Sequence, residues 1–296
     1  MIKTFRGIFV LSRPRQISKN LLVILPATVS GEIFTWLSNG SKYLELLTVL
    51  ICFSIASIIV YILNDILDFQ NDKKNPQRIN RPLVSGKVNK KAAVIYACVL
   101  SITLLLLLIS SSNSLVKFIF TYITINFFYS VKLKQIKYWE IIAVSSGYVL
   151  RALAGATIVD SSPSQEFYLF ILFFSISIVA SKRMSELIAS ASIYRTVLRS
   201  YTKESLIAMY TISITISLYA YSSFIFSLST NNESSFALDI TSVASLLVLI
   251  IIFFEFTTIS FKGLVQSPED LLKSNRFIQF NVLLFVISTI SIGILR

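Results

Sequence analysis

Three aspartates that directly follow a hydrophobic segment have the spacing of a metal site. Residues 44–63 are almost all apolar, and Asn64, Asp65, Asp68 and Asp72 come next. On a helix that continues this segment, carboxylates at positions i, i+3 and i+7 share one face. Carboxylates this close repel one another, and Mg²⁺, which prefers oxygen ligands, removes the repulsion. We therefore predict that Asp65, Asp68 and Asp72 hold Mg²⁺ and a diphosphate. The alternative is a solvated helix end, which the helix dipole would oppose.

Basic side chains follow the aspartates in the same loop. The planar guanidinium group of arginine matches phosphate oxygens, so arginines and metal-bound acids together can clamp a diphosphate from two sides. Arg78 and Arg81 are flanked by prolines, and we predict that both, like Asn64, bind the substrate. The two lysines at the start of the loop are better explained by membrane topology.

The composition is that of an integral membrane protein. Of the 296 residues, 54% are hydrophobic and only 14% are charged, and the mean hydropathy is +0.74, beyond the range of soluble domains. We predict an all-α bundle of nine transmembrane helices at about 17–38, 44–63, 92–110, 115–131, 139–159, 166–180, 205–229, 236–256 and 277–295. The first segment is a poor match to a cleavable signal peptide and is predicted to remain a helix. No linker interrupts the pattern, so residues 1–296 are predicted to form one transmembrane domain.

The distribution of lysine and arginine predicts the orientation. Cytoplasmic segments of membrane proteins carry an excess of these bases. Of the 27 bases, 23 fall before or at the start of the first span, or at the connections after spans two, four, six and eight. An N-in, C-out topology follows, with the long charged loops and the chemistry on the cytoplasmic face. Topology and anionic lipid headgroups also explain the net charge of +12, so no nucleic-acid partner is predicted.

Several kinds of chemistry are excluded by what the sequence lacks. It contains no histidine, which removes imidazole bases, histidine-ligated metals and Ser-His-Asp catalysis. It also lacks GxxxxGK[ST] and GxGxxG phosphate loops, so chemistry driven by ATP or NAD is not expected. Cys52 and Cys98 lie in apolar spans and are interpreted as buried hydrophobic residues. Carboxylates, a metal ion, lysine and arginine remain.

The acidic motif is similar to that of a known family. Asn64-Asp65-x-x-Asp68-x-x-x-Asp72, followed by Arg81-Pro82-Leu83, resembles the first aspartate-rich motif of the UbiA superfamily of membrane prenyltransferases. The span count and topology agree, so the resemblance covers essentially the whole chain. Typical members have a second aspartate-rich motif after helix six, and both motifs hold Mg²⁺ against a prenyl diphosphate. Here the corresponding segment is Ser181-Lys182-Arg183-Met184-Ser185-Glu186-Leu187, with bases where acids are expected.

That departure is similar to one branch, the polyprenyl-phosphate (decaprenyl-phosphate) phosphoribosyltransferases. The segments that carry this resemblance are Arg13-Pro14-Arg15-Gln16-x-x-Lys19-Asn20, Tyr148-Val149-Leu150-Arg151-Ala152-Leu153-Ala154-Gly155, Ser181-Lys182-Arg183-x-x-Glu186-Leu187, Tyr194-Arg195-x-Val197-Leu198 and Ser267-Pro268-Glu269-Asp270-Leu271-Leu272. The resemblance implies Mg²⁺-dependent transfer of 5-phosphoribose from 5-phosphoribosyl 1-pyrophosphate to a polyprenyl phosphate lipid, with release of pyrophosphate. It also implies a bacterial plasma-membrane enzyme of cell-wall biosynthesis. At Asn275 the resemblance leads us to expect an acid instead.

The bases of the second motif suit that substrate pair. The 5-phosphate of the donor and the phosphate of the lipid are anions that a second acidic cluster would repel. We therefore predict that Lys182, Arg183 and the neighbouring Glu186 belong to the substrate site. The alternative is a simple i, i+4 ion pair between Lys182 and Glu186, worth only about 0.3–0.5 kcal/mol. The acceptor phosphate is already ionised, so the reaction needs no histidine base.

Further candidates lie within and at the ends of the spans. An arginine deep in a span costs roughly 2.5 kcal/mol or more unless it faces a polar cavity, so we predict that Arg151 contacts a substrate phosphate or one of the loop acids. Lys19 and Tyr129 are candidates for phosphate contact at the cytoplasmic boundary, as are Lys132 and Lys134. Interfacial anchoring explains these four nearly as well.

Two other functions stay open from the sequence. One is an ordinary UbiA-type enzyme that moves a prenyl group from a prenyl diphosphate to an aromatic or quinone-precursor acceptor. The other is a membrane transporter, for which acids distributed through the spans and an inverted repeat are expected; here the acids cluster at one mouth. The sequence leaves the isoprenoid length and the oligomeric state undecided, and a homo-oligomer is compatible with it.

Overall fold

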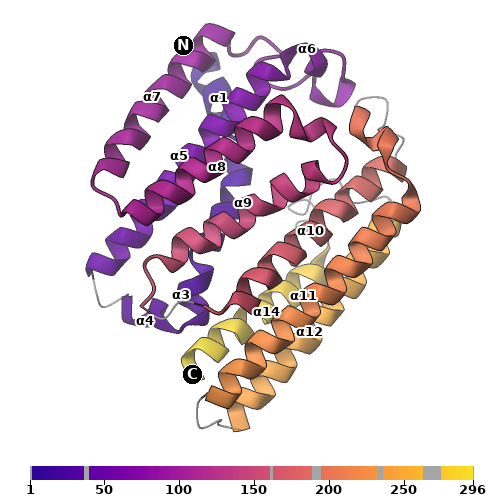
Figure 1. Ribbon diagram of the computed structural model, residues 1–296. Coiled ribbons are helices and arrows are strands. Elements are labelled where there is room, and N and C mark those ends of the chain that lie inside the picture. Colours follow the sequence, from indigo (N-terminus) through magenta and orange to yellow (C-terminus); the bar gives the residue numbers. More distant parts are fainter. Residues whose placement is uncertain are drawn as a thin grey trace.

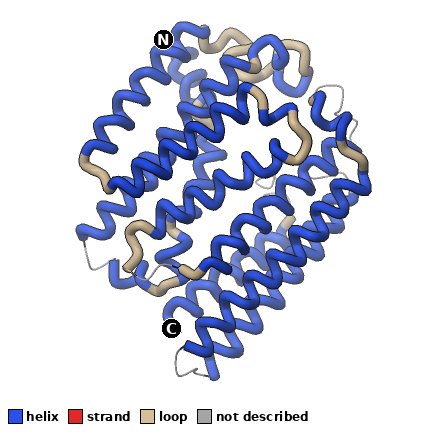
Figure 2. The backbone as a smooth tube through the Cα atoms, in the orientation of Figure 1, coloured by secondary structure: helices blue, strands red, loops and turns tan. Residues whose placement is uncertain are grey.

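The structure is a computed structural model that describes residues 2–36, 40–160, 163–188, 195–231, 236–262 and 275–295. Long helices lie side by side in a bundle (Figure 1), and the described residues contain no strand (Figure 2). Within these described ranges, seven helices are long and apolar enough to cross a membrane: α5 (Gly40–Leu67), α7 (Lys90–Ile109), α8 (Asn113–Val131), α10 (Gln165–Ile188), α11 (Lys203–Asn231), α12 (Phe236–Phe261) and α14 (Arg276–Leu295). The predicted all-α membrane fold is confirmed, whereas the count of nine spans and the orientation remain predictions.

The fifth predicted span forms a helix with charged residues inside it. This helix, α9 (Trp139–Ala156), buries both Glu140 and Arg151. Helix α9 is therefore not one of the seven helices that are long and apolar enough to cross a membrane. It packs against α8 on one side and α10 on the other, so it lies in the interior of the bundle. A charged helix at this place is tolerated because its polar groups face protein and a cavity rather than lipid.

The first predicted span, 17–38, is not one helix, and that prediction was wrong. The described chain there is divided into α2 (Pro14–Ile17), η1 (Ser18–Val23), α3 (Leu25–Val29) and α4 (Glu32–Trp36), preceded by α1 (Ile2–Leu11). Pro26 has no N–H to continue a preceding helix, so it stands in the first turn of α3. Gly31 has a φ of 76°, which ends the next segment in a conformation that favours glycine. The break places Asn20 in the interior.

Glycines let the bundle close around this broken segment. A Cβ atom on Gly155 of α9 would overlap the carbonyl oxygen of Val23, and one on Gly293 of α14 would overlap that of Thr28. In lipid, helix association depends on close van der Waals packing of this kind, because lipid tails are as apolar as leucine. The two glycines therefore hold η1 and α3 against the long helices.

The acidic motif continues α5 with one irregularity. Helix α5 ends at Leu67 and α6 (Phe69–Asp72) follows, with Asp68 between them. The Asp68 N–H donates to the Asn64 carbonyl at 2.9 Å, and the Asp72 N–H donates to the Asp68 carbonyl at 2.9 Å. The helical hydrogen-bond pattern that the motif requires is thus largely present. The short helix η2 (Pro76–Arg78) and a loop then lead into α7.

The sixth span runs further than predicted. Helix α10 continues to Ile188, past the predicted end at 180, so Lys182, Arg183 and Glu186 lie on the helix and not in a loop. The remaining described elements are η3 (Leu133–Gln135) and η5 (Thr196–Ser200). Helices η3 and η5 contact each other near the start of α9. This end of the bundle therefore collects several polar segments.

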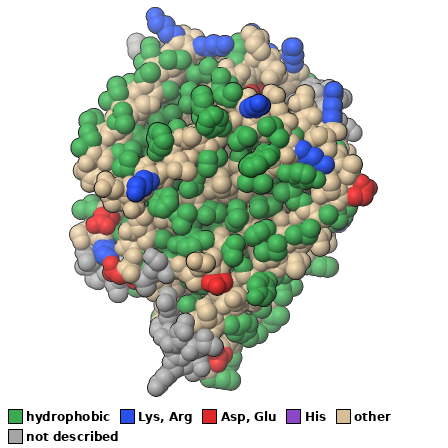
Figure 3. Space-filling view, in the orientation of Figure 1, with side chains coloured by type: hydrophobic (Ala, Val, Ile, Leu, Met, Phe, Trp, Pro, Cys, Tyr) green, Lys and Arg blue, Asp and Glu red, His purple; other side chains and the backbone are tan. Residues whose placement is uncertain are grey.

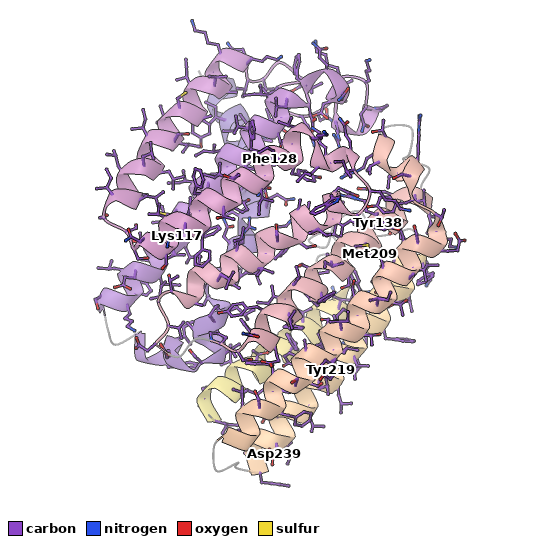
Figure 4. The ribbon with its side chains drawn as sticks, in the orientation of Figure 1. Lys117, Phe128, Tyr138, Met209, Tyr219 and Asp239 are labelled. Carbon is purple, nitrogen blue, oxygen red and sulfur yellow. The ribbon has the colours of Figure 1, made fainter. Side chains whose placement is uncertain are left out.

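Charge is distributed unevenly over the surface. In Figure 3 hydrophobic side chains cover most of the visible face, and most Lys and Arg side chains lie toward the end that carries α6 and the N-terminus. Figure 4 places Tyr138 toward that end and Asp239 at the opposite one. An apolar belt with a basic end is the pattern that membrane topology produces.

Candidate functional site

A cavity of about 620 Å³ opens among η1, α5, α8, α9 and α10. Among the residues that the structure describes, its walls carry one acid, Asp68, and ten bases: Arg13, Lys19, Lys74, Arg78, Arg81, Lys134, Arg151, Lys182, Arg183 and Arg195. Polar neutral groups such as Asn64 and Tyr129 line it too. An enclosed surface with this many cations attracts polyanionic ligands, because low-dielectric walls strengthen the field of the charges.

The three predicted metal ligands are buried and paired with bases. Asp65 accepts hydrogen bonds from Arg13 and, at 3.0 Å, from Arg81. Asp72, which is 1% exposed, accepts from Arg78 at 2.7 Å and also from Arg81. Arg81 therefore bridges two of the aspartates. Burial lowers the pKa of Arg81, although the carboxylate of Asp65 opposes this shift.

Asp68 differs from the other two aspartates because it lines the cavity. Its carboxylate accepts a hydrogen bond from Lys134, which follows α8. Asp65 and Asp72 are absent from the cavity wall, where Arg13, Arg78 and Arg81 stand in front of them. The motif thus places one aspartate on the cavity wall and two behind arginines.

The three carboxylates do not converge on one point in the described structure. Among the residues that it describes, no group of three or more Asp, Glu or Cys side chains is placed to hold a metal ion. Each of the three carboxylates accepts from at least one base, and Arg81 contacts two of them. The assignment of Asp65, Asp68 and Asp72 to a metal site therefore remains a prediction.

The donor set nevertheless fits Mg²⁺. The carboxylates of the three aspartates and the side-chain amide of Asn64 offer oxygen atoms, the ligand type that Mg²⁺ prefers. Asn64 lines the cavity one turn before Asp68, and its Oδ1 is buried with no hydrogen-bond partner in the described part of the chain. Buried polar atoms are normally satisfied. The amide oxygen of Asn64 is therefore available as a further oxygen ligand beside Asp68.

Arg151 is buried deep in α9 at the cavity wall, as predicted. Its Nε donates to Asn20 at 2.7 Å, and one terminal nitrogen donates to Ser57 at 3.2 Å and to Tyr122 at 3.0 Å. The other terminal nitrogen donates to the Gly147 carbonyl. All these acceptors are neutral. The loop acids, one of the two predicted partners, are instead occupied by other bases.

The second motif forms a network that the sequence did not indicate. Arg183 donates to Glu140 at 2.6 Å and to Glu186 at 2.9 Å. Arg195 donates to the other oxygen of Glu140 at 2.7 Å and to the Tyr129 hydroxyl at 3.1 Å. The alternative of a Lys182–Glu186 ion pair is not what forms, because Glu186 pairs with the arginines.

The remaining predicted residues have definite places. Lys19 and Tyr129 line the cavity, and the Lys19 ammonium lies 5.8 Å from the ring centre of Tyr148. Asn275 caps α14, accepting from the N–H groups of Phe277 and Ile278, and its side-chain amide donates to Glu255 at 3.2 Å. The predicted motif at 267–272 lies outside the described residues.

One site residue, Glu140, escaped the sequence analysis. A signal existed for it, because an acid inside a membrane segment is a site candidate by the same rule that singled out Arg151. The sequence makes Lys134 a candidate for phosphate contact, whereas Arg13 and Arg195 enter there only as members of the segments that carry the resemblance. The pairing of these three bases with buried acids is visible only in the structure.

The described residues form an all-helical membrane fold around a cavity that is lined mainly by basic side chains. The chain belongs to the UbiA prenyltransferase family, whose model matches residues 23–262, and it is a transferase. A decaprenyl-phosphate phosphoribosyltransferase from Mycobacterium tuberculosis is 30% identical over 286 residues, 95% of this chain and 92% of its own. One from Mycolicibacterium smegmatis is 29% identical over 291 residues, 95% and 90% of the two chains.

Solved structures agree on the fold. A UbiA homolog from Archaeoglobus fulgidus, bound to GPP and Mg²⁺, has a TM-score of 0.71 and 13% sequence identity, covering 97% of this chain and 99% of its own. At this identity the likeness establishes the arrangement of helices and nothing finer.

Proposed function

We propose that the protein transfers 5-phosphoribose from 5-phosphoribosyl 1-pyrophosphate to a polyprenyl phosphate lipid, with Mg²⁺ as cofactor and pyrophosphate as product. The observation that carries the proposal is the cation excess of the cavity, ten bases against one acid. The donor has a diphosphate and a 5-phosphate, and the acceptor brings another phosphate, so both substrates are anionic. The similarity to decaprenyl-phosphate phosphoribosyltransferases supports the same assignment.

We assign the diphosphate of the donor to the acidic end of the cavity. Asp65, Asp68 and Asp72 would hold Mg²⁺ there, with Asn64 beside them, and the ion would neutralise charge on the departing pyrophosphate. Arg78 and Arg81 stand on the same wall and are suited to donate hydrogen bonds to the diphosphate oxygens.

The reaction requires no general base. The bond between ribose C1 and the pyrophosphate oxygen breaks, and a bond between C1 and a lipid phosphate oxygen forms. The attacking oxygen is already ionised, so no proton has to be removed, in keeping with a sequence that has no histidine. Lys19, Arg151, Lys182 and Arg183 line the cavity from other helices, and we assign them to the phosphate groups that are not displaced. Fixed cations there orient the reactants at no reorganisation cost.

We further propose nine membrane-spanning segments in one UbiA-like domain over residues 1–296, with the N-terminus and the cavity mouth facing the cytoplasm of a bacterial cell. The broken segment η1–α3 and the charged helix α9 would be the two spans beyond the seven apolar helices. The basic loops near α6 support this orientation. Irregular and charged segments at membrane depth are tolerated where they line a cavity.

Prenyl transfer to an aromatic acceptor is the second candidate. The observation that favours it is the fold it shares with a UbiA homolog bound to GPP and Mg²⁺. A prenyl diphosphate, however, carries its charge at one end only. The bases of α9 and α10 would then have no substrate phosphate to bind.

One experiment separates the two candidates. Purified protein in detergent is incubated with Mg²⁺, polyprenyl phosphate and donor labelled in the ribose, and the lipids are then extracted. We expect label in the lipid phase, its loss with excess chelator, and its recovery when Mg²⁺ is restored. A parallel reaction contains labelled prenyl diphosphate and an aromatic acceptor. Prenyl transfer without any labelled lipid in the first reaction would contradict the proposal.

A further inference from the structure

The carboxylate of Glu140 connects two separate parts of the cavity wall. Glu140 is fully buried in the first turn of α9. One of its oxygens accepts from Arg183 on α10 at 2.6 Å, and the other accepts from Arg195, just before η5, at 2.7 Å. A single side chain thus fixes two arginines that are not neighbours in the sequence. A carboxylate in the first turn of a helix also interacts favourably with the helix dipole.

The network is polarised toward the cavity. Arg183 and Arg195 both line the cavity, whereas the acids that pair with them, Glu140 and Glu186, do not. Glu186 accepts from Arg183 at 2.9 Å and lies 3.9 Å from Arg195. The acids therefore stand behind the arginines, and the cavity meets guanidinium groups. Lys182 adds a further cation to the same wall.

We propose that Glu140 is a positioning residue that holds Arg183 and Arg195 in place, so that these arginines and Lys182 form a subsite for a phosphate monoester. The inference rests on the proposed function and deepens it. The phosphate monoester is either the 5-phosphate of the sugar donor or the phosphate of the lipid acceptor, since the same cations recognise both.

Arg195 shows why positioning is needed. It stands outside any described helix, so no helical scaffold sets the direction of its long side chain. Glu140 and the Tyr129 hydroxyl, at 3.1 Å, fix one terminal nitrogen. Its Nε is buried and has no hydrogen-bond partner among the described residues. A buried donor without an acceptor is costly, and an oxygen of a phosphate bound in the cavity would satisfy it.

Glu140 is itself anchored. The N–H of Tyr138 donates to the Tyr201 hydroxyl at 2.8 Å, and the Lys137 ammonium lies 4.8 Å and 5.5 Å from the ring centres of Tyr138 and Tyr201. Burial raises the pKa of Tyr201 to about 12, so its phenol stays protonated at physiological pH. These contacts fix the start of α9 and with it the carboxylate two residues later.

Glu140→Gln tests the proposal because it keeps the shape and removes the charge. We expect KM for one phosphate substrate to rise about 10-fold or more, since one or two charge-assisted contacts are lost, with kcat within about 3-fold. A rise confined to the donor identifies the 5-phosphate, and a rise confined to the lipid identifies the acceptor phosphate. Glu204→Gln, an exposed acid in the first turn of α11, is the matched control. Unchanged KM values for both substrates would overturn the proposal.

Variants of Arg195 keep the proposal testable if Glu140→Gln folds poorly, and where it folds a double-mutant cycle shows whether Glu140 acts through Arg195. Arg195→Gln alone should raise the same KM, and Arg195→Lys should recover part of the loss. If Glu140 acts through the arginines, the KM of the double variant should be close to that of Arg195→Gln. If the KM of the double variant instead equals the product of the two single effects, Glu140 acts independently of Arg195, which contradicts the proposal.

Binding measurements separate this proposal from the proposed function. Calorimetry with ribose 5-phosphate and, separately, with a short polyprenyl phosphate needs no turnover. We expect one of these probes to bind the wild type at least 10-fold more tightly than Glu140→Gln. If that difference appears without phosphoribosyl transfer by the wild type, the subsite stands and the proposed reaction fails. If transfer occurs but Glu140→Gln binds both probes like the wild type, the subsite fails and the reaction stands.

Discussion

At the scale of single residues, position relative to the cavity separates side chains that the sequence motif treats alike. Asp68 lines the cavity, whereas Asp65 and Asp72 lie behind arginines. Removing the carboxylate that lines the cavity would affect a bound ion, whereas removing an acid behind an arginine also takes an ion-pair partner from that arginine. Substitution of Asp68 should therefore lower activity alone, whereas substitution of Asp72 should lower both activity and stability.

Asp68→Asn should lower kcat/KM by about 100-fold or more, because it removes the metal ligand that faces the cavity. Its thermal unfolding in detergent should stay close to that of the wild type, since Asp68 pairs with a single lysine. Phosphoribosyl transfer to lipid and the unfolding midpoint are measured on the same preparation. Wild-type activity would contradict the metal assignment.

Asp72→Asn should lose activity and stability together. It leaves Arg78 and Arg81 without their shared carboxylate, which we expect to cost about 2–4 kcal/mol in the free energy of unfolding. This is less than for a fully buried pair, because the arginines are partly exposed. Thermal or denaturant unfolding measures the effect. Equal unfolding midpoints for Asp72→Asn and Asp68→Asn would show that the two aspartates do not differ as described.

Arg151→Gln should lower kcat/KM about 10- to 100-fold, the loss of one charge-assisted contact of about 1.5–3 kcal/mol. The neutral partners Asn20 and Tyr122 can hydrogen-bond to glutamine as well, so folding should be retained. Arg151→Lys, which keeps the charge, should recover part of the activity. Equal activity of both variants and the wild type would exclude contact with a substrate phosphate.

At the scale of elements, the broken first segment depends on glycine contacts. Gly155→Ala places a methyl group against the Val23 carbonyl, so η1 and α9 must move apart. We expect a loss of about 1–3 kcal/mol in the free energy of unfolding, as for other overpacked sites. Gly40→Ala is the control, because nothing lies within 4 Å of its new Cβ atom. Equal thermal stability of the two variants would show that η1 and α9 do not need this close contact.

At the scale of the whole molecule, the orientation can be tested on both sides of α7. Asn80 lies in the loop before this helix and Asn113 begins α8 after it, so the two residues stand at opposite ends of a 20-residue helix, about 30 Å long. In a background without Cys52 and Cys98, Asn80→Cys should react with a membrane-impermeant thiol reagent only from the cytoplasmic side. Asn113→Cys should react only from the outside. Labelling of both from one side would refute the proposed topology.

The sequence predicted the features that depend on neighbours along the chain. Hydrophobic length predicted the membrane fold and the positions of most helices, because burial in lipid requires an unbroken apolar segment. Spacing predicted that Asp65, Asp68 and Asp72 lie on two successive and nearly continuous helical turns. Charge content singled out Arg151 and the bases of α10, because an ion at membrane depth needs a polar environment.

Only the tertiary structure decided the partners of these groups. Arg13 reaches Asp65 across 52 positions, Lys134 reaches Asp68 across 66, and Arg151 reaches Asn20 across 131. The break at 17–38 is decided in the same way, because Asn20 and Val23 fit against α9 only where glycine permits close approach. An ion pair depends on distance in space, and packing brings together residues whose spacing in the sequence carries no trace of the contact. This is why the acidic motif could be predicted from the sequence, whereas the Glu140 network could not.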